Sequence, residues 1–168
     1  NGLKMFKREE FTITKNNNGV MHITMNPISK AFVSHALKCG GTVLDIGSAY
    51  GVATIPVLIG NPNVRVIACD ISKKHLEELE ERVKLIEEKE GTKIFDRLII
   101  LNKKFPDFDL EENSLDAILA SHVLPFLTGK EIEKGIAKLA KFLKPGGVLY
   151  ISSYSIYNKV MKNYISIY

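Results

Sequence analysis

The residues best suited to chemistry form one run, Val43-Leu44-Asp45-Ile46-Gly47-Ser48-Ala49-Tyr50-Gly51. Its first half is β-branched and apolar, as in a buried strand, and its second half is a glycine-rich turn. Gly47 can take backbone angles that other residues avoid, and Gly51 lets a following helix start close to the strand. The turn is expected to present free backbone N–H groups at a helix N-terminus, which favour a carboxylate or phosphate. The run therefore predicts a site for a flat or extended ligand.

A second acid, Asp70, follows the next apolar run and lies 23 positions after Gly47. A carboxylate at this point can accept hydrogen bonds from both hydroxyls of a ribose. The glycine spacing, Gly47-x-Ala49-x-Gly51, differs from the Gly-x-Gly-x-x-Gly of a dinucleotide site, so a pyrophosphate is disfavoured. An adenosine-like ligand fits both observations. The alternative is that Asp70 only caps a helix beginning near Ser72.

Apolar runs and helical patterns alternate along the chain, and this alternation must position the glycine turn and Asp70. It predicts an α/β fold with a doubly wound, mainly parallel sheet and helices on both faces. In such a sheet the ligand binds at the carboxyl ends of the strands, where the winding reverses. The expected strands are 42–46, 64–69, 98–101, 115–120 and 148–151, and the expected helices begin near Ser29, Val52, Ser72 and Thr128.

Length and composition favour one globular domain over 1–168. The chain has 168 residues, of which 45% are apolar and 25% charged. A chain of this length and composition can form a stable hydrophobic core without disulfide bonds. Two cysteines, Cys39 and Cys69, exclude a disulfide-rich module, and no apolar run approaches the length of a membrane span. The net charge of +4 comes from mixed charges and is weak support for a nucleic-acid partner. No export signal is visible, so we expect a cytoplasmic location.

Three motifs together resemble the class I methyltransferases that use S-adenosylmethionine. They are the turn Asp45 to Gly51, Asp70 after the second strand, and Leu143-Lys144-Pro145-Gly146-Gly147-Val148-Leu149 before the fifth. All three have the order and spacing of the family, and the resemblance covers roughly 29–153. It divides the chain into an N-terminal extension, 1–28, a cofactor-binding core, 29–153, and a C-terminal segment, 154–168. Two departures are Ala49 in place of the middle glycine and no room for the family's last two strands, so we expect a fragment.

The resemblance implies a role for each matching residue. The turn would lie beside the methionine portion and the ribose of the cofactor, Asp70 on the ribose hydroxyls, and Ile71 against the adenine. The adenine edge would meet Asn102 or Lys103, of which Asn102 is favoured because its amide both donates and accepts. The end of the fourth strand would face the sulfonium and the methyl acceptor. The expected cofactor-binding residues are Asp45, Gly47, Ser48, Ala49, Tyr50, Gly51, Asp70, Ile71, Asn102 and Ser121.

Catalytic residues are harder to assign. Asp45 fits a structural role better, in which it accepts hydrogen bonds from the N–H groups of the turn. His122 is the weak candidate for a catalytic base, with packing or hydrogen bonding as the alternative. The other histidines, His22, His35 and His75, have no partners at metal-ligand spacing, so no metal site is expected. Tyr50, Tyr154 and Tyr157 are candidates for the wall of an acceptor pocket.

The function implied by the resemblance is methyl transfer from S-adenosylmethionine to an unidentified acceptor, with a small molecule or protein favoured. The segment Ser121 to Phe126 lacks the family's Asn-Pro-Pro-aromatic signature for amino-group acceptors, which disfavours base methylation of nucleic acid and glutamine methylation. The alternative is a non-catalytic domain of the same fold that binds a partner protein. A nicotinamide dehydrogenase is disfavoured by the glycine spacing.

Overall fold

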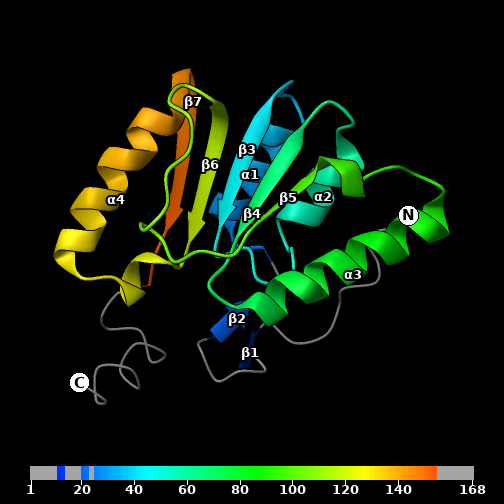
Figure 1. Ribbon diagram of the computed structural model, residues 1–168, viewed down its shortest axis with the longest axis horizontal. Helices are drawn as coiled ribbons and strands as arrows, with labels where there is room; N and C mark the ends of the chain where they lie inside the picture. Colours follow the sequence, from blue (N-terminus) through cyan, green and yellow to red (C-terminus); the bar gives the residue numbers. More distant parts are fainter. Residues whose placement is uncertain (1–10, 14–19, 23–24, 155–168) are drawn as a thin grey trace.

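Five parallel strands form the central sheet of the computed structural model, which describes residues 11–13, 20–22 and 25–154. Their order across the sheet is β5-β4-β3-β6-β7 (Figure 1). The winding reverses between β3 and β6, which places the switch point beside the carboxyl end of β3. The predicted doubly wound α/β sheet is therefore confirmed. The strands are β3, Thr42–Ile46; β4, Arg65–Cys69; β5, Leu98–Leu101; β6, Leu115–Ser121; and β7, Leu143–Ser152.

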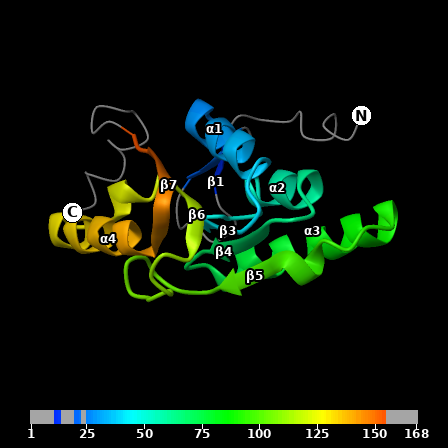
Figure 2. The same cartoon turned by 90° about the horizontal axis from the view of Figure 1, so that it is seen from above.

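Helices cover both faces of the sheet, because buried parallel strands are apolar on both sides. Figure 2 shows α1 and α2 on one face and α4 on the other. The apolar side chains of α3 pack into the same core as those of α1 and α2, whereas those of α4 pack into the second core. The helices are α1, Pro27–Ala36; α2, Thr54–Gly60; α3, Lys73–Glu90; and α4, Gly129–Phe142.

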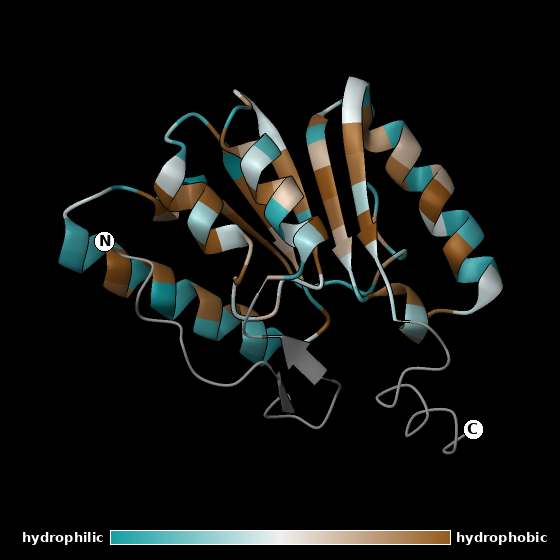
Figure 3. Ribbon diagram, turned by 180° about the vertical axis from the view of Figure 1, so that it is seen from behind, coloured by the Kyte–Doolittle hydropathy of each residue, from teal (hydrophilic) through white to brown (hydrophobic). Residues whose placement is uncertain are grey.

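The two cores follow the alternation of side chains along each strand. Val43 and Val66 face the α1, α2 and α3 side, while their neighbours Leu44 and Ile67 face the α4 side. In Figure 3 the strands are mostly brown, whereas α3 and α4 alternate between brown and teal, as expected for helices with one apolar face. Burial of both sheet faces is thus the main stabilisation that holds the carboxyl ends of the strands in place.

Local capping decides where the helices begin. Ser72 caps α3 by accepting from His75 N, and α4 begins with a capping box between Thr128 and Glu131. The helix expected to begin near Ser29, a residue type that often caps helices, begins two residues earlier, at Pro27. Asn26 is the cap, because its Oδ1 accepts from Ser29 N at 2.9 Å and Pro27 occupies the first helical position.

The remaining described elements are short. Strands β1, Phe11–Ile13, and β2, Val20–His22, pair with each other in an antiparallel ladder outside the central sheet. Two 3₁₀ turns, η2, Phe95–Arg97, and η3, Leu124–Phe126, precede β5 and follow β6. Strand β7 begins directly after α4, five residues before the apolar run that predicted it, and its register with β6 shifts between Leu115 and Ala117. Apart from Tyr154, the segment 154–168 lies outside the described residues.

Candidate cofactor site

The carboxyl ends of β3 and β4 bring the glycine turn and Asp70 together (Figure 1). The turn crosses from β3 to β4, since Gly47 N and Ser48 N both donate to Cys69 O, at 2.8 and 3.1 Å. Asp70 is the next residue after Cys69, so its side chain reaches back to the turn. The spacing of 23 residues in the sequence has therefore become direct contact in the fold.

Asp70 links three segments through one carboxylate. Its Oδ2 accepts from Ala49 N at 2.9 Å, and its Oδ1 accepts from Ser72 N at 2.8 Å. His75 Nδ1 lies 3.5 Å from the same Oδ1. Asp70 is only 8% exposed, so these bonds are shielded from water. Both alternatives drawn from the sequence are compatible with this geometry, because a carboxylate has about four acceptor positions and Ser72 N and Ala49 N use two.

The backbone of the turn adopts conformations that few residues tolerate. Gly47, Ala49 and Gly51 have φ of +74°, +45° and +86°, in the left-handed region that favours glycine. A Cβ at Gly51 would lie 2.3 Å from Leu79 Cδ1, and one at Gly47 would lie 2.8 Å from Val123 Cγ2. Ala49 does adopt a positive φ, so its departure from the family's glycine is accommodated.

The expectation that the turn presents free N–H groups is wrong for four of its amides. Gly47 N and Ser48 N donate to Cys69 O, Ala49 N to Asp70, and Gly51 N to Ser48 O. The helix that follows, α2, has seven residues. These amides hold the turn in shape, so the geometry favours a ligand recognised by shape and by Asp70 over an anion bound to backbone amides.

Asp45 at the end of β3 is fully buried beneath the turn. Its Oδ2 accepts from Thr54 Oγ1 at 2.7 Å, so Asp45 holds the first residue of α2. Asp45 was expected to accept hydrogen bonds from the N–H groups of the turn, and Thr54 is the donor instead. Burial raises the pKa of Asp45 from 3.8 to about 6; the bond from Thr54 opposes this rise and the nearby charge of Asp70 adds to it. Asp45 is a support of the turn in this geometry.

The other predicted cofactor residues lie around this centre. Ile71 is 64% exposed directly after Asp70, and an exposed isoleucine there is available to a flat ring. Asn102 Nδ2 donates to Asp70 O and Ile71 O, at 2.9 and 3.0 Å, which holds the end of β4 beside β5. Ser48 is buried, and its hydroxyl has no hydrogen-bond partner among the residues that the structure describes.

Tyr50, a candidate for the wall of an acceptor pocket, packs against α3. Its buried ring packs edge-on against His75, with centroids 4.7 Å apart, and Arg82 lies 5.1 Å from its centroid. These are residues of α3. Tyr154 instead stacks on His122, with centroids 4.0 Å apart, and Tyr157 lies outside the described residues. The tyrosines proposed to wall one pocket are thus divided between α3 and the end of β6.

Ser121 and His122 belong to a polar cluster that the sequence did not reveal. Ser121 Oγ lies 3.0 Å from both Asn26 Nδ2 and Ser152 Oγ, and Asn26 Nδ2 lies 3.2 Å from His122 Nε2. Ser29 completes the group at 3.4 Å from Ser121. The one available signal for Asn26 was the dipeptide Asn26-Pro27, which is typical of a helix start; nothing marked Ser152.

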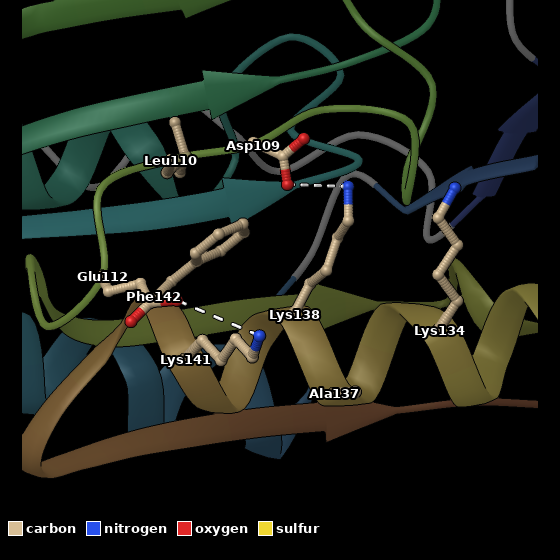
Figure 4. Close-up of a pocket in the computed structure, with 8 residues that line it drawn as sticks. All are labelled: Asp109, Leu110, Glu112, Lys134, Ala137, Lys138, Lys141 and Phe142. Atoms are coloured by element: carbon tan, nitrogen blue, oxygen red, sulfur yellow. Dashed lines mark ion pairs between the residues drawn. The ribbon is translucent and has the colours of Figure 1, made fainter.

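Two further features of the described residues lie outside the site. No group of three or more His, Cys, Asp or Glu within them has a geometry that could hold a metal ion, and none of their helices has the length and hydropathy of a membrane span. A groove between α4 and 109–112 is bordered by the ion pairs of Lys138 with Asp109 and of Lys141 with Glu112 (Figure 4). This groove lies near the amino ends of β6 and β7, whereas the turn lies at the carboxyl ends of the strands.

Comparison with known proteins identifies the family. Residues 44–149, more than half of the chain, match the model of a family described as methyltransferase domain. The tRNA N(3)-cytidine methyltransferase METTL2 of Mus musculus is 30% identical over 118 residues, which are 69% of this chain and 29% of that protein. The O-methyltransferase 3 of Dictyostelium discoideum is 30% identical over 125 residues, 74% of this chain and 28% of that protein. The chain thus spans less than a third of these relatives.

Solved structures share the fold. A SAM-dependent methyltransferase from Aquifex aeolicus superposes with a TM-score of 0.61 at 22% identity, covering 79% of this chain and 66% of that one. The phosphoethanolamine N-methyltransferase 1 of Haemonchus contortus, solved with phosphoethanolamine and S-adenosylhomocysteine, gives 0.61 at 16% identity, covering 76% and 25%. The chain belongs to the methyltransferase-domain family and has the Rossmann-like fold of the class I methyltransferases, whose cofactor is S-adenosylmethionine.

Proposed function

We propose that this domain binds S-adenosylmethionine at the carboxyl ends of β3 and β4 and transfers its methyl group to an acceptor held beside β6. The observation that carries the proposal is the bond from Ala49 N to Asp70 Oδ2, at 2.9 Å. It joins the glycine turn to the acid expected on the ribose, and both lie at the switch point of the sheet, where ligands of this fold bind.

The residues of the chain then have mainly a positioning role. The sulfonium of the bound cofactor supplies an already activated methyl group, so the protein gains most by holding two reactants at attack distance. Asp70 and Ile71 hold the adenosine, the rigid turn sets its depth, and Asn102 fixes both residues through their carbonyl groups. A dedicated base is needed only for an acceptor that must lose a proton.

The acceptor is proposed at the level of class. The sequence pattern after β6 favoured a small molecule or protein over nucleic acid, whereas the relatives include tRNA N(3)-cytidine methyltransferases. The same relatives include an O-methyltransferase and a phosphoethanolamine N-methyltransferase. A tRNA pool, a protein extract and a small-molecule extract are therefore the three acceptor pools to compare.

The first experiment is calorimetric titration of the purified chain with S-adenosylhomocysteine, with NADH as the control ligand. Binding near one-to-one without NADH heat is expected, and it must weaken strongly in Asp70→Asn. Methyl-tritium-labelled cofactor is then incubated with the three pools. Incorporation that requires Asp70 identifies the acceptor class; cofactor binding without incorporation into any pool would support the alternative, a non-catalytic domain that binds a partner protein.

A further inference from the structure

The cluster at the carboxyl ends of β6 and β7 is centred on Asn26. Its Nδ2, which carries two hydrogens, lies within 3.2 Å of three polar atoms: Ser121 Oγ, Ser152 Oγ and His122 Nε2. Asn26 itself comes from the start of α1, which packs across β6 and β7. One amide therefore joins a helix terminus to the ends of two strands, one of which is β6, beside which the methyl acceptor is proposed to bind.

The orientation of this amide is determined by the helix. Asn26 Oδ1 accepts from Ser29 N at 2.9 Å as the N-cap of α1. A flipped amide would aim its NH₂ group at the Ser29 N–H, so two donors would face each other and the cap would be lost. The NH₂ group must therefore face Ser121, His122 and Ser152.

This orientation also determines the state of His122. Nδ2 of an amide is only a donor, so a protonated Nε2 facing it at 3.2 Å would set two donors against each other. An unprotonated Nε2, which can accept, is the form that fits this contact. An imidazole whose Nε2 accepts carries its proton on Nδ1 and is neutral. The ring is held in place further by stacking on Tyr154 and by a backbone bond from His122 N to Ser152 O at 2.8 Å.

His122 lies close to the cofactor turn. It adopts a φ of +57° between β6 and Val123, and a Cβ at Gly47 would lie 2.8 Å from Val123 Cγ2 and 3.8 Å from Ser121 O. The residues on either side of His122 thus border Gly47. A neutral ring at this point adds no positive charge beside a cofactor that is itself a cation, whereas an imidazolium would repel it.

We propose that Asn26 is a positioning residue that holds His122 as the neutral, Nδ1-protonated tautomer at the acceptor side of the cofactor site. While the bond from Asn26 stands, Nε2 of His122 is occupied and does not take a proton from the acceptor. The proposal that this tautomer serves methyl transfer rests on the proposed function; the tautomer itself does not.

The test is NMR of the chain labelled with ¹⁵N at its histidines, at mildly alkaline pH. Long-range proton-nitrogen correlations distinguish the two tautomers, and the signals of His122 are those lost in His122→Gln. The wild-type chain is expected to show a protonated Nδ1 and an unprotonated Nε2. A protonated Nε2 in the wild-type chain would overturn the proposal without any variant of Asn26.

Asn26→Asp is the diagnostic substitution, because aspartate is an equally good N-cap and keeps an acceptor for Ser29 N. Its second oxygen would face Nε2 and require a proton there, so the His122 pattern is expected to change to Nε2-protonated or doubly protonated. Asn61→Asp is the matched control, since Asn61 donates to Ala36 O and Cys39 O, away from the cluster. An unchanged His122 pattern in Asn26→Asp would refute the role of Asn26.

The link to function has its own readout. Affinity for S-adenosylhomocysteine is expected to change less than about twofold in Asn26→Asp, while incorporation of labelled methyl into the active pool falls about tenfold or more. Full incorporation with an altered tautomer would refute the catalytic part of the proposal. Failure of the wild-type chain to bind S-adenosylhomocysteine would refute the proposed function, and the NMR result would still decide the tautomer.

Discussion

Asp70 accepts a hydrogen bond from Ala49 N at 2.9 Å, and the two residues are 21 positions apart in the chain. The same carboxylate accepts from Ser72 N at 2.8 Å, so the acid expected on the ribose also holds the turn and the start of α3 in register. Shape and recognition at this site depend on one side chain, which makes Asp70 the residue whose replacement has the clearest expected result.

Asp70→Asn is expected to weaken S-adenosylhomocysteine binding at least about tenfold. Asparagine keeps the size of the side chain but has only one acceptor oxygen, and a hydrogen bond to a charged group contributes about 1.5 to 3 kcal/mol. The matched control is Asp116→Asn, because Asp116 Oδ2 also accepts a backbone N–H, from Thr42 at 2.9 Å, at the opposite end of β3. Calorimetry on both variants decides: equal losses of affinity would contradict the assignment of Asp70 to the ligand.

Gly51→Ala is expected to destabilise the fold by about 2 to 4 kcal/mol. Its φ of +86° penalises any side chain, and the new Cβ would lie 2.3 Å from Leu79 Cδ1, so strain and overpacking add. Gly91→Ala is the control, since Gly91 has φ +66° but nothing within 4 Å of the new atom; it should lose only about 1 to 2 kcal/mol. Urea unfolding of the two variants separates the cost of the backbone conformation from the cost of the contact. Equal losses of stability would show that the contact with Leu79 adds nothing to the loss in Gly51→Ala.

The strands and the doubly wound arrangement were predictable from the sequence, because buried parallel strands appear as apolar runs and their crossovers have one hand. The run 98–101 matches β5, and 115–120 falls one residue short of β6. The residues at which helices begin were less predictable. Serine is a common N-cap, so Ser29 was a reasonable start for α1, but Asn26 is an equally good N-cap type and is followed by Pro27, which suits the first helical position.

The polar part of the site could not be predicted, because its contacts are set by packing between distant elements. Asn26 meets Ser121 across 95 positions and Ser152 across 126, and these pairs depend on how α1 crosses β6 and β7. The amides of the turn were expected to be free by analogy with a helix N-terminus. Cys69 O and the Asp70 carboxylate accept three of them, and only the strand pairing brings those acceptors near.

Arg97→Met is expected to cost about 2 to 4 kcal/mol of stability. The guanidinium of Arg97 donates to Leu58 O, Asn61 O and Val64 O, at 2.5 to 2.9 Å, and so satisfies carbonyls at the end of α2 and before β4. Removing the donor leaves buried acceptors unpaired, at about 1 to 3 kcal/mol each when water cannot replace it. Arg65→Met, at an exposed position on β4, is the control and should change stability by less than about 0.5 kcal/mol. Similar losses in the two variants would refute the stabilising role given to the three hydrogen bonds of Arg97.

The stability of the chain is expected to fall as the pH rises through about 6, because of Asp45. Burial raises its pKa from 3.8 to about 6, so between these values the folded state holds a proton that the unfolded state has released. Linkage then requires stability to decrease with rising pH in this range, by up to about 3 kcal/mol for a shift of this size. Asp45→Asn removes the titration but keeps an oxygen to accept from Thr54 Oγ1.

The free energy of unfolding, measured in urea for the wild type and for Asp45→Asn below pH 3.8 and above pH 6, tests this assignment. The difference in stability between the two proteins should shift in favour of the Asp45→Asn variant as the pH rises, because only the wild type must ionise a carboxyl group in the dry space beneath the turn. A constant difference across the range would show that the buried carboxyl ionises at its ordinary pKa, and that water reaches the base of the cofactor turn.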